Sequence, residues 1–480
     1  MQIVSFEFLF FFTCILLIYH IIPARFRCVF LLAASYFFYG SQNILYLGFL
    51  IFATLISYCG ALLMKYLGNT LFGRRTVFVF TMVLNLLMLG YFKYAGFLTG
   101  GRINSLMLPV GISFYLFMSC GYLVDVYNGR ISAERNLIRY ALFVSFFPTI
   151  LSGPIERAGN MIPQFTTDFL EKVQFDTERI RNGFVRILWG YFMKLVLADR
   201  IAILVNAVYR SPENYGGALV AITSILYTFQ IYCDFAGYSH IAIGIAETLG
   251  IRVMENFRCP YLATSISDFW RRWHISLSSW FRDYIYIPLG GNRKGAVRKY
   301  LNIMIVFLLS GLWHGAGWTF VIWGGLHGLY QVVGALFKPV REKIAAFLKV
   351  NRLSSSSKVV SVIFTFGLVS FAWISFRAEN LISVAEICKR FMHPQIWELF
   401  DGTICTLGLD HPNLAVMFLG LMLVIAVDIL NERGIFISKY IARERLWIRW
   451  PIYIITILVI LICGVWGAGY DTASFIYYQF

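Results

Sequence analysis

Long apolar runs without a charged residue alternate along the chain with short basic segments. Stretches free of Asp, Glu, Lys and Arg cover residues 8–24, 28–64, 76–92, 103–124, 214–233, 300–337, 359–376, 412–427 and 450–470. Because a spanning helix needs about 20 apolar residues, most of these runs predict one membrane crossing. The runs 28–64 and 300–337 are long enough for two crossings, with breaks predicted at 40–43 and 315–317.

Two further helices, at 140–151 and 183–208, are predicted where isolated charges interrupt the apolar pattern. The chain should therefore contain about eleven transmembrane helices, together with re-entrant or interfacial ones. Composition supports this, because 59% of the residues are hydrophobic and 14% are charged, against roughly 45–50% and about 25% in a soluble domain. The sequence predicts an all-α polytopic membrane protein.

The chain carries 41 basic and 25 acidic residues, a net charge of +16. The basic residues lie in short loops between apolar runs, which is the positive-inside pattern and not that of a nucleic-acid-binding face. Segments 25–27 and 65–75 contain no acidic residue, so both are expected in the cytoplasm. The two crossings between them, and one before them, place the N-terminus outside.

Three regions are too polar for simple membrane-spanning segments. In the first, 148–164 (PTILSGPIERAGNMIPQ), three prolines and two glycines interrupt any helix beside Glu156 and Arg157. This pattern fits either an interfacial loop or the wall of a site. The second, 268–291 (DFWRRWHISLSSWFRDYIYIPLGG), interleaves aromatic and basic residues as an interfacial helix would. Its His274 is expected to be partly desolvated, which lowers the pKa of an imidazole and keeps it neutral.

The third region, 310–328 (SGLWHGAGWTFVIWGGLHG), places His314 and His327 within an uncharged run. Ionisable residues inside a membrane are costly and indicate function by default. For His327, helix packing through small residues with histidine as a hydrogen-bonding group is the preferred interpretation. For His314 we expect a functional role. No metal site is predicted, because acidic residues near the histidines lack ligand spacing.

The second and third regions closely resemble the membrane-bound O-acyltransferase (MBOAT) family, and within it the bacterial branch of alginate O-acetylation. The matching segments are FWRRWHISLSSWFRDYIYIPLGGNRKG (269–295) and SGLWHGAGWTFVIWGGLHG (310–328). Supporting segments are LPVGISFYLF (108–117), SGPIERAGNMIPQF (152–165), YCDFAGYSHIAIGIA (232–246) and FIYYQF (475–480). The resemblance spans nearly the whole chain.

This resemblance implies a multi-helix ring around a thinned centre, with a tunnel joining both faces. It implies one integral membrane domain over residues 1–480, with a catalytic core at about 108–337, in a bacterial cytoplasmic membrane. By the same resemblance, His314 is the catalytic histidine. His274 occupies the second polar position of the site, which is Asn, Asp or His across the family.

The implied activity is transfer of an acyl group, acetyl above all, from a cytoplasmic thioester to an exported polysaccharide. His314 would act as general base, and His274 would stabilise the developing oxyanion. Acetyl-CoA enters as donor substrate, with no bound cofactor. Substrate-binding residues are expected among Trp273, Trp313, His327 and the basic residues Arg271, Arg272, Arg293 and Lys294.

An extracytoplasmic O-acetyltransferase and polysaccharide export machinery are the expected partners, in a lipid membrane and without nucleic acid. If the last helix ends outside, Tyr477 or Tyr478 could accept the acyl group transiently and pass it to that transferase. An aromatic anchor at the membrane interface explains the same residues and is preferred to the acyl relay.

Other functions remain open. Peptidoglycan O-acetylation and D-alanyl transfer to teichoic acid use related membrane enzymes, the latter with a carrier-protein thioester. Outside the enzymes, a transporter or flippase with a histidine proton relay is the main alternative. Transporters usually carry structural repeats, and the sequence shows no internal repeat.

Overall fold

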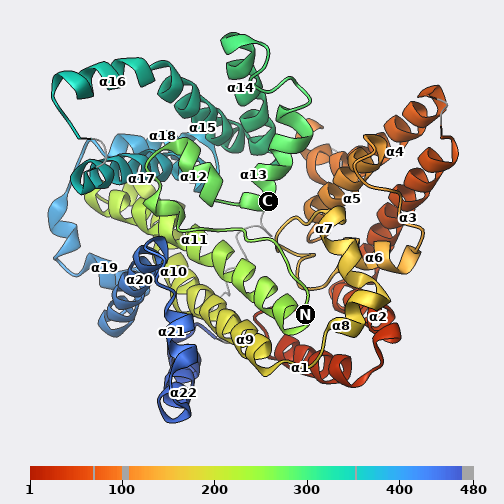
Figure 1. The fold of residues 1–480 in the computed structure, drawn as a ribbon. Coiled ribbons are helices and arrows are strands. Elements are labelled where there is room, and N and C mark those ends of the chain that lie inside the picture. Colours follow the sequence, from red (N-terminus) through yellow and green to blue (C-terminus); the bar gives the residue numbers. More distant parts are fainter. Residues whose placement is uncertain (69–70, 100–107, 352–353, 467–480) are drawn as a thin grey trace. The chain divides into compact units, whose positions relative to one another are not determined.

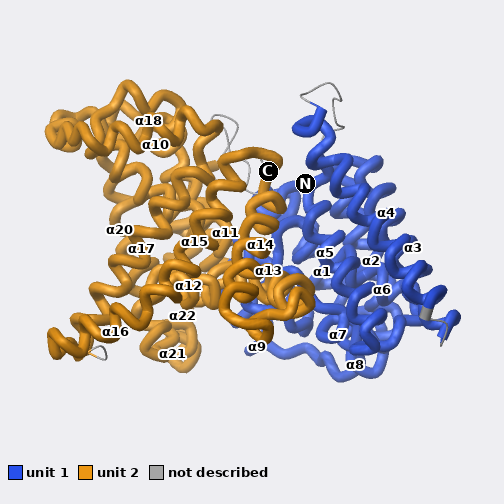
Figure 2. The backbone as a smooth tube through the Cα atoms, turned by 90° about the horizontal axis from the view of Figure 1, so that it is seen from above, with its two compact units in different colours: residues 1–187, 238–255 blue, residues 188–237, 256–480 orange. Residues whose placement is uncertain are grey.

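A computed structural model describes residues 1–68, 71–99, 108–351 and 354–466. Within these ranges the chain forms helices, turns and loops, and no strand. The predicted all-α class is confirmed. Figure 2 colours two compact units, residues 1–187 with 238–255 and residues 188–237 with 256–480. We describe each unit by itself, and the single domain over 1–480 stays a prediction.

Unit 1 contains α1 (Phe6–Ile21), α2 (Ala24–Gly40), α3 (Ile44–Tyr66), α4 (Leu71–Leu98), α5 (Ile112–Tyr127), α6 (Leu137–Ser145), α7 (Ala158–Met161), η1 (Ile162–Phe165) and α8 (Thr167–Lys172). Two helices, α9 (Thr177–Tyr191) and α11 (Gly217–Thr248), have residues in both units. Figure 1 labels the α-helices along the chain.

Unit 2 begins with η2 (Phe192–Ala198), α10 (Asp199–Arg210), η3 (Pro212–Asn214), η4 (Pro260–Leu262), α12 (Ile266–Arg272), α13 (Ile275–Phe281) and η5 (Arg282–Tyr286). It continues with α14 (Gly295–His314), α15 (Trp318–Leu336), α16 (Lys338–Phe347), α17 (Ser355–Arg377), α18 (Leu381–Arg390), η6 (Ile396–Leu399), α19 (Thr403–Thr406), α20 (His411–Glu432), α21 (Ile437–Arg443) and α22 (Leu446–Cys463).

Eight of the described helices are long and apolar enough to cross a membrane, namely α3, α4, α11, α14, α15, α17, α20 and α22. Two shorter apolar helices, α1 and α5, accompany them. Many large apolar side chains on these helices point away from the protein, and Phe10 and Phe72 are 74% and 86% exposed. Lipid covers such surfaces in a membrane protein. The predicted total of about eleven crossings stays a prediction.

Both predicted interruptions of the long apolar runs are confirmed. Within 28–64, α2 ends at Gly40 and α3 begins at Ile44. Asn43 caps α3, because its side-chain oxygen accepts the backbone N–H of Leu45 at 2.9 Å. Within 300–337, α14 ends at His314 and α15 begins at Trp318.

One helix is shorter than predicted. The helix expected over 140–151 is α6, which ends at Ser145 and continues as turns. Pro148 explains this end, because a proline removes one helical hydrogen bond and disfavours helical geometry in the preceding residue. By contrast, 183–208 is helical throughout, with the π-helix η2 between α9 and α10.

In unit 1, the polar segment 148–164 binds the backbone of a neighbouring loop. The carboxylate of Glu156 is buried and accepts the backbone N–H of Met254 and the amide of Asn160. The Gln164 amide donates to the carbonyl of Arg252 at 2.9 Å and accepts its N–H at 2.8 Å. These bonds satisfy buried polar groups as a strand partner would, so the segment supports the loop at 251–255.

Unit 2 contains a buried cluster of three charges. The ammonium of Lys194, on η2, lies 2.7 Å from carboxylate oxygens of both Asp199 and Asp234. All three side chains are at most 5% exposed. Buried charges persist where they are paired, because removing one partner leaves an uncompensated charge at a cost of about 3–5 kcal/mol. The cluster therefore fixes η2 and α10 against α11 within this unit.

Glycines bring α14 and α15 into close contact. A Cβ at Gly324 would overlap the backbone carbonyl of Phe307, and one at Gly311 would overlap that of Phe320. Gly328 faces Met304 in the same interface. Small residues allow helix backbones to approach closely where lipid gives no hydrophobic driving force. Gly311, Gly324 and Gly328 therefore serve helix packing, the interpretation preferred from the sequence for the region around His327.

The close contact predicts different responses to two neighbouring glycine-to-alanine substitutions. Gly324→Ala should lower the thermal unfolding midpoint of the detergent-solubilised protein, because overpacking typically costs about 1–3 kcal/mol. Gly325→Ala is the matched control, since its nearest neighbour would be Leu308 at 3.8 Å. Equal midpoints for the two variants would contradict the assigned packing.

Candidate active site

His314 lies at the C-terminal end of α14 and is 3% exposed. Three aromatic rings surround its imidazole edge-on. The centroid distances are 4.8 Å to Trp313, 5.0 Å to Trp323 and 5.2 Å to Phe376. The following residue, Gly315, is extended and ends the helix. The imidazole is thus held among aromatic rings at a helix end.

His274 lies between α12 and α13 in the left-handed region, with φ 43°. Few residues other than glycine adopt this conformation, and such strain gathers at functional sites. Backbone bonds on either side hold it. The N–H of Arg258 donates to the carbonyl of Arg272, and that of Ile275 to the carbonyl of Asn256, both at 2.9 Å. The loop 256–258 therefore sets the position of His274.

The side chain of Asn256 binds His274 directly. Its Oδ1 lies 3.1 Å from Nδ1 of His274, and it also accepts the hydroxyl of Ser276 at 3.0 Å. The imidazole is 1% exposed, with the ring of Phe235 perpendicular to it at 4.6 Å. Burial lowers the pKa of His274 to about 3, so the ring is neutral at physiological pH.

His327, on α15, is completely buried among aromatic rings. Its Nδ1 accepts the indole N–H of Trp270 at 3.2 Å. The ring stacks between Phe269 at 6.1 Å and Phe307 at 6.2 Å. These contacts match the packing role preferred from the sequence, and substrate binding by His327 stays a prediction.

Tryptophans connect the three histidines within unit 2. Trp313 contacts His274 at 6.2 Å and His314 at 4.8 Å. Trp323 contacts His314 at 5.0 Å and His327 at 5.2 Å. Histidines that are 13 to 53 positions apart in the sequence thus share one aromatic cluster. Trp273 extends this cluster, because the centroid of its ring lies 5.1 Å from that of Trp373.

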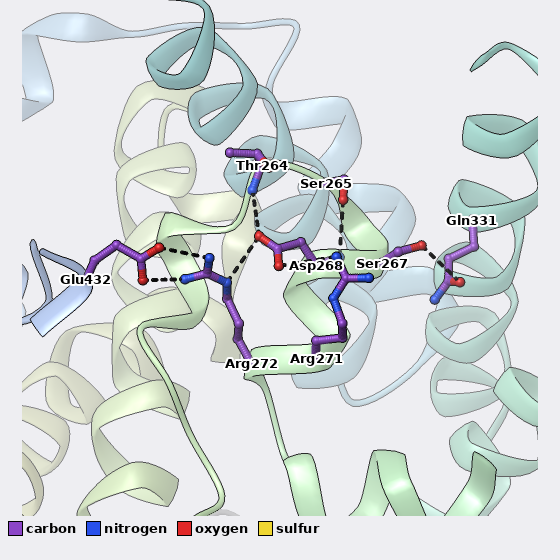
Figure 3. A network of polar contacts seen from close by, with 8 residues as sticks. All are labelled: Thr264, Ser265, Ser267, Asp268, Arg271, Arg272, Gln331 and Glu432. Atoms are coloured by element: carbon purple, nitrogen blue, oxygen red, sulfur yellow. Dashed lines mark hydrogen bonds and ion pairs between the residues drawn. The ribbon is translucent and has the colours of Figure 1, made fainter. Parts of the chain in front are cut away.

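The basic residues expected to contact coenzyme phosphates differ in their surroundings. Figure 3 shows the guanidinium of Arg272 between Asp268 of its own helix and Glu432 of α20. Its Nε lies 3.1 Å from Asp268, and its terminal nitrogens donate to Glu432 at 2.7 and 3.0 Å. Arg272 is therefore bound within the protein, as a bidentate ion pair.

The other three basic residues are accessible. Arg271 is 71% exposed on its side chain, 3.4 Å from Asp268. Arg293 and Lys294 are exposed in the turn before α14. Phosphate binding by all four basic residues stays a prediction. Tyr477 and Tyr478, the residues of the predicted relay, lie outside the described residues.

The family model for MBOAT, the membrane-bound O-acyltransferase family, matches residues 31–375. That range contains His274, His314 and His327, together with the tryptophans around them. The chain belongs to the membrane-bound O-acyltransferase family. This confirms the resemblance, the class of enzyme and the membrane setting that the sequence predicted. The O-acyltransferase is accordingly a membrane protein.

Curated relatives of this O-acyltransferase carry three kinds of name. "Probable alginate O-acetylase AlgI" of Azotobacter vinelandii is 38% identical over 84% of this chain and 79% of its own. "Peptidoglycan O-acetyltransferase" of Helicobacter pylori is 34% identical over 75% and 72%. "Teichoic acid D-alanyltransferase" of Bacillus subtilis is 27% identical over 58% and 70%.

Sequence reasoning missed several residues of the O-acyltransferase site. Trp373 and Phe376 belong to α17, and their distance from the histidines in the sequence gave no signal. Trp323 stood inside a recognised segment, and its helical spacing from His327 could have indicated a shared face. Asn256 is a single amide in an ordinary loop, so only the fold reveals its contact with His274.

The pKa of His274 predicts how the stability of the O-acyltransferase depends on pH. The folded value of about 3 lies below the usual 6.5, so between these values the unfolded state binds the extra proton. The contribution of His274 to the free energy of unfolding is therefore fully present above about pH 6.5 and decreases as the pH falls toward 3. Between pH 7.5 and 5 the loss should be on the order of 2 kcal/mol.

Thermal unfolding in detergent, measured for the wild type and His274→Gln at both pH values, checks this expectation. Glutamine does not titrate, so the variant should lose less stability on acidification than the wild type. The same loss in both proteins would show that His274 is not the titrating group.

Proposed function

We propose that this O-acyltransferase takes acetyl groups from cytoplasmic acetyl-CoA and passes them across a bacterial cytoplasmic membrane to an exported polysaccharide. The observation that carries this proposal is the burial of two imidazoles, those of His274 and His314, against the indole of Trp313. An imidazole can accept a proton from an attacking hydroxyl and return it to the leaving thiolate. Two relatives named "Probable alginate O-acetylase AlgI", 38% and 36% identical to this chain, support acetyl as the group transferred and a polysaccharide as the acceptor.

In this mechanism, His314 accepts the proton of the acceptor hydroxyl while the hydroxyl oxygen attacks the thioester carbonyl. The carbon–sulfur bond breaks, and the coenzyme leaves as a thiol with the proton that His314 accepted. The rings of Trp313, Trp323 and Phe376 exclude water around His314, which prevents hydrolysis of the thioester. The N-terminus lies outside, following the basic loops at 25–27 and 65–75.

A separate extracytoplasmic O-acetyltransferase completes the transfer of the acetyl group to the polysaccharide. This partner works with polysaccharide export machinery. A second acceptor, peptidoglycan, is favoured by the relative from Helicobacter pylori, which is 34% identical over three quarters of the chain. D-alanyl transfer has weaker support, since that relative is 27% identical over 58% of the chain.

Replacing His314 tests the proposed base. His314→Ala should lower the release of free coenzyme A from acetyl-CoA by about 10²–10⁴-fold, the usual contribution of a general base. The measurement uses purified protein in lipid nanodiscs with polysaccharide fragments, and it follows thiol release and acetyl label on the sugar.

His327→Gln is the matched control, because it removes another buried imidazole of the same cluster. It should retain activity within about tenfold if His327 serves packing. Turnover that survives in a folded His314→Ala would refute the base, and a wild type inactive with acetyl-CoA but active with a carrier-protein thioester would favour D-alanyl transfer.

The exposed cations before α14 provide a test of donor binding. Arg293→Gln with Lys294→Gln should raise the KM for acetyl-CoA several-fold and leave kcat nearly unchanged, because phosphate contacts bind ground state and transition state alike. The effect should shrink at high salt, which screens exposed charges. Lys338→Gln, an exposed cation beyond α15, is the control. An unchanged KM in the double variant would exclude these phosphate contacts.

A further inference from the structure

Three groups converge on the side-chain oxygen of Asn256. Two come from Ser276, whose backbone N–H and hydroxyl donate at 3.3 and 3.0 Å. The third is Nδ1 of His274, at 3.1 Å. All three residues are at most 1% exposed. Because the N–H of Ser276 can only donate, the amide atom that faces it is the carbonyl oxygen and not the NH₂ group.

This orientation determines the tautomer of His274. A carbonyl oxygen can only accept, so Nδ1 of the imidazole must carry its proton. A neutral imidazole has one protonated nitrogen and one with a free lone pair. The lone pair of His274 therefore belongs to Nε2, which makes Nε2 an acceptor of hydrogen bonds.

We propose that Asn256 is a positioning residue of the transfer reaction, whose side-chain carbonyl fixes His274 as the Nδ1–H tautomer and presents Nε2 as an acceptor for a substrate hydroxyl. This inference rests on the proposed function and replaces the oxyanion role that the sequence led us to expect for His274. In this tautomer Nε2 has no proton to donate to an oxyanion. His274 then orients the hydroxyl-bearing acceptor, while His314 remains the base.

The surroundings of His274 favour this state over a charged one. Its neighbours include the amide of Asn256, the hydroxyl of Ser276 and the rings of Phe235 and Trp313. Burial lowers the pKa of its imidazole. The nearest titratable ring across Trp313 is that of His314, which is itself buried and apolar in setting.

Nitrogen NMR tests the tautomer without any substrate. The full chain, labelled with ¹⁵N in its histidine rings, is reconstituted in lipid bilayers, and the signals of His274 are assigned by their loss in His274→Asn. The wild type should show a protonated Nδ1 and an unprotonated Nε2 that resonates far downfield. In Asn256→Leu, which cannot accept, the Nε2–H form should appear. A wild type with Nε2 protonated would overturn the inference.

The pH dependence of turnover tests the role in transfer. Asn256→Asp keeps the accepting oxygens but adds a negative charge, which raises the pKa of the imidazole. If Nε2 must accept, the activity of Asn256→Asp relative to the wild type should fall at least tenfold between pH 8 and pH 6. If His274 instead donates to an oxyanion, protonation would help, and the same ratio would stay level or rise. The second outcome would overturn the proposal.

Two further variants separate positioning from simple folding. Asn256→Leu should lower kcat at least tenfold with little change in KM for acetyl-CoA. Ser276→Ala is the matched control, because it removes one donor to the same oxygen and leaves His274 bound; it should stay within about threefold of the wild type. Since NMR needs no turnover, an inactive wild type would refute the proposed donor alone, while a wrong tautomer would refute the inference alone.

Discussion

The close approach of α14 and α15 is the constraint on which the site depends. Their glycines, Gly311 and Gly324, bring the two backbones together at distances that any Cβ would prevent. His314 ends one of these helices and His327 lies on the other, so the approach determines that both face Trp323. Because lipid gives no hydrophobic driving force between helices, this packing must come from shape.

The site also requires that its buried histidine rings have their polar atoms satisfied. An unsatisfied polar group in an apolar interior costs free energy, and a charged one costs much more. The site meets this requirement by giving two of its buried imidazoles a hydrogen-bonding partner. Trp270 donates to His327, and Asn256 accepts from His274. Aromatic rings fill the remaining volume with contacts edge-on or stacked, which suit the quadrupoles of the rings. The result is a rigid setting in which proton positions are determined by the protein.

The relatives and the geometry constrain different parts of the function. Family membership establishes an O-acyltransferase, and two relatives are named for O-acetylation of alginate and of peptidoglycan. The geometry bears on the reacting groups, because it places two histidines against one indole and gives one of them a defined tautomer.

The sequence alone determined the helical class, the membrane setting and both breaks in the long apolar runs, because chain-local patterns carry these features. It also selected His314, which is conspicuous in an uncharged segment, and His274, which stands among aromatic and basic residues. Pro148 was a local signal for the early end of α6, but the prediction gave more weight to the apolar pattern around it. Only the tertiary structure revealed Asn256 as the partner of His274, the internal ion pair of Arg272 with Glu432, and the packing role of the glycines. These depend on which segments meet in space, and no local pattern records the distance between residues remote in sequence.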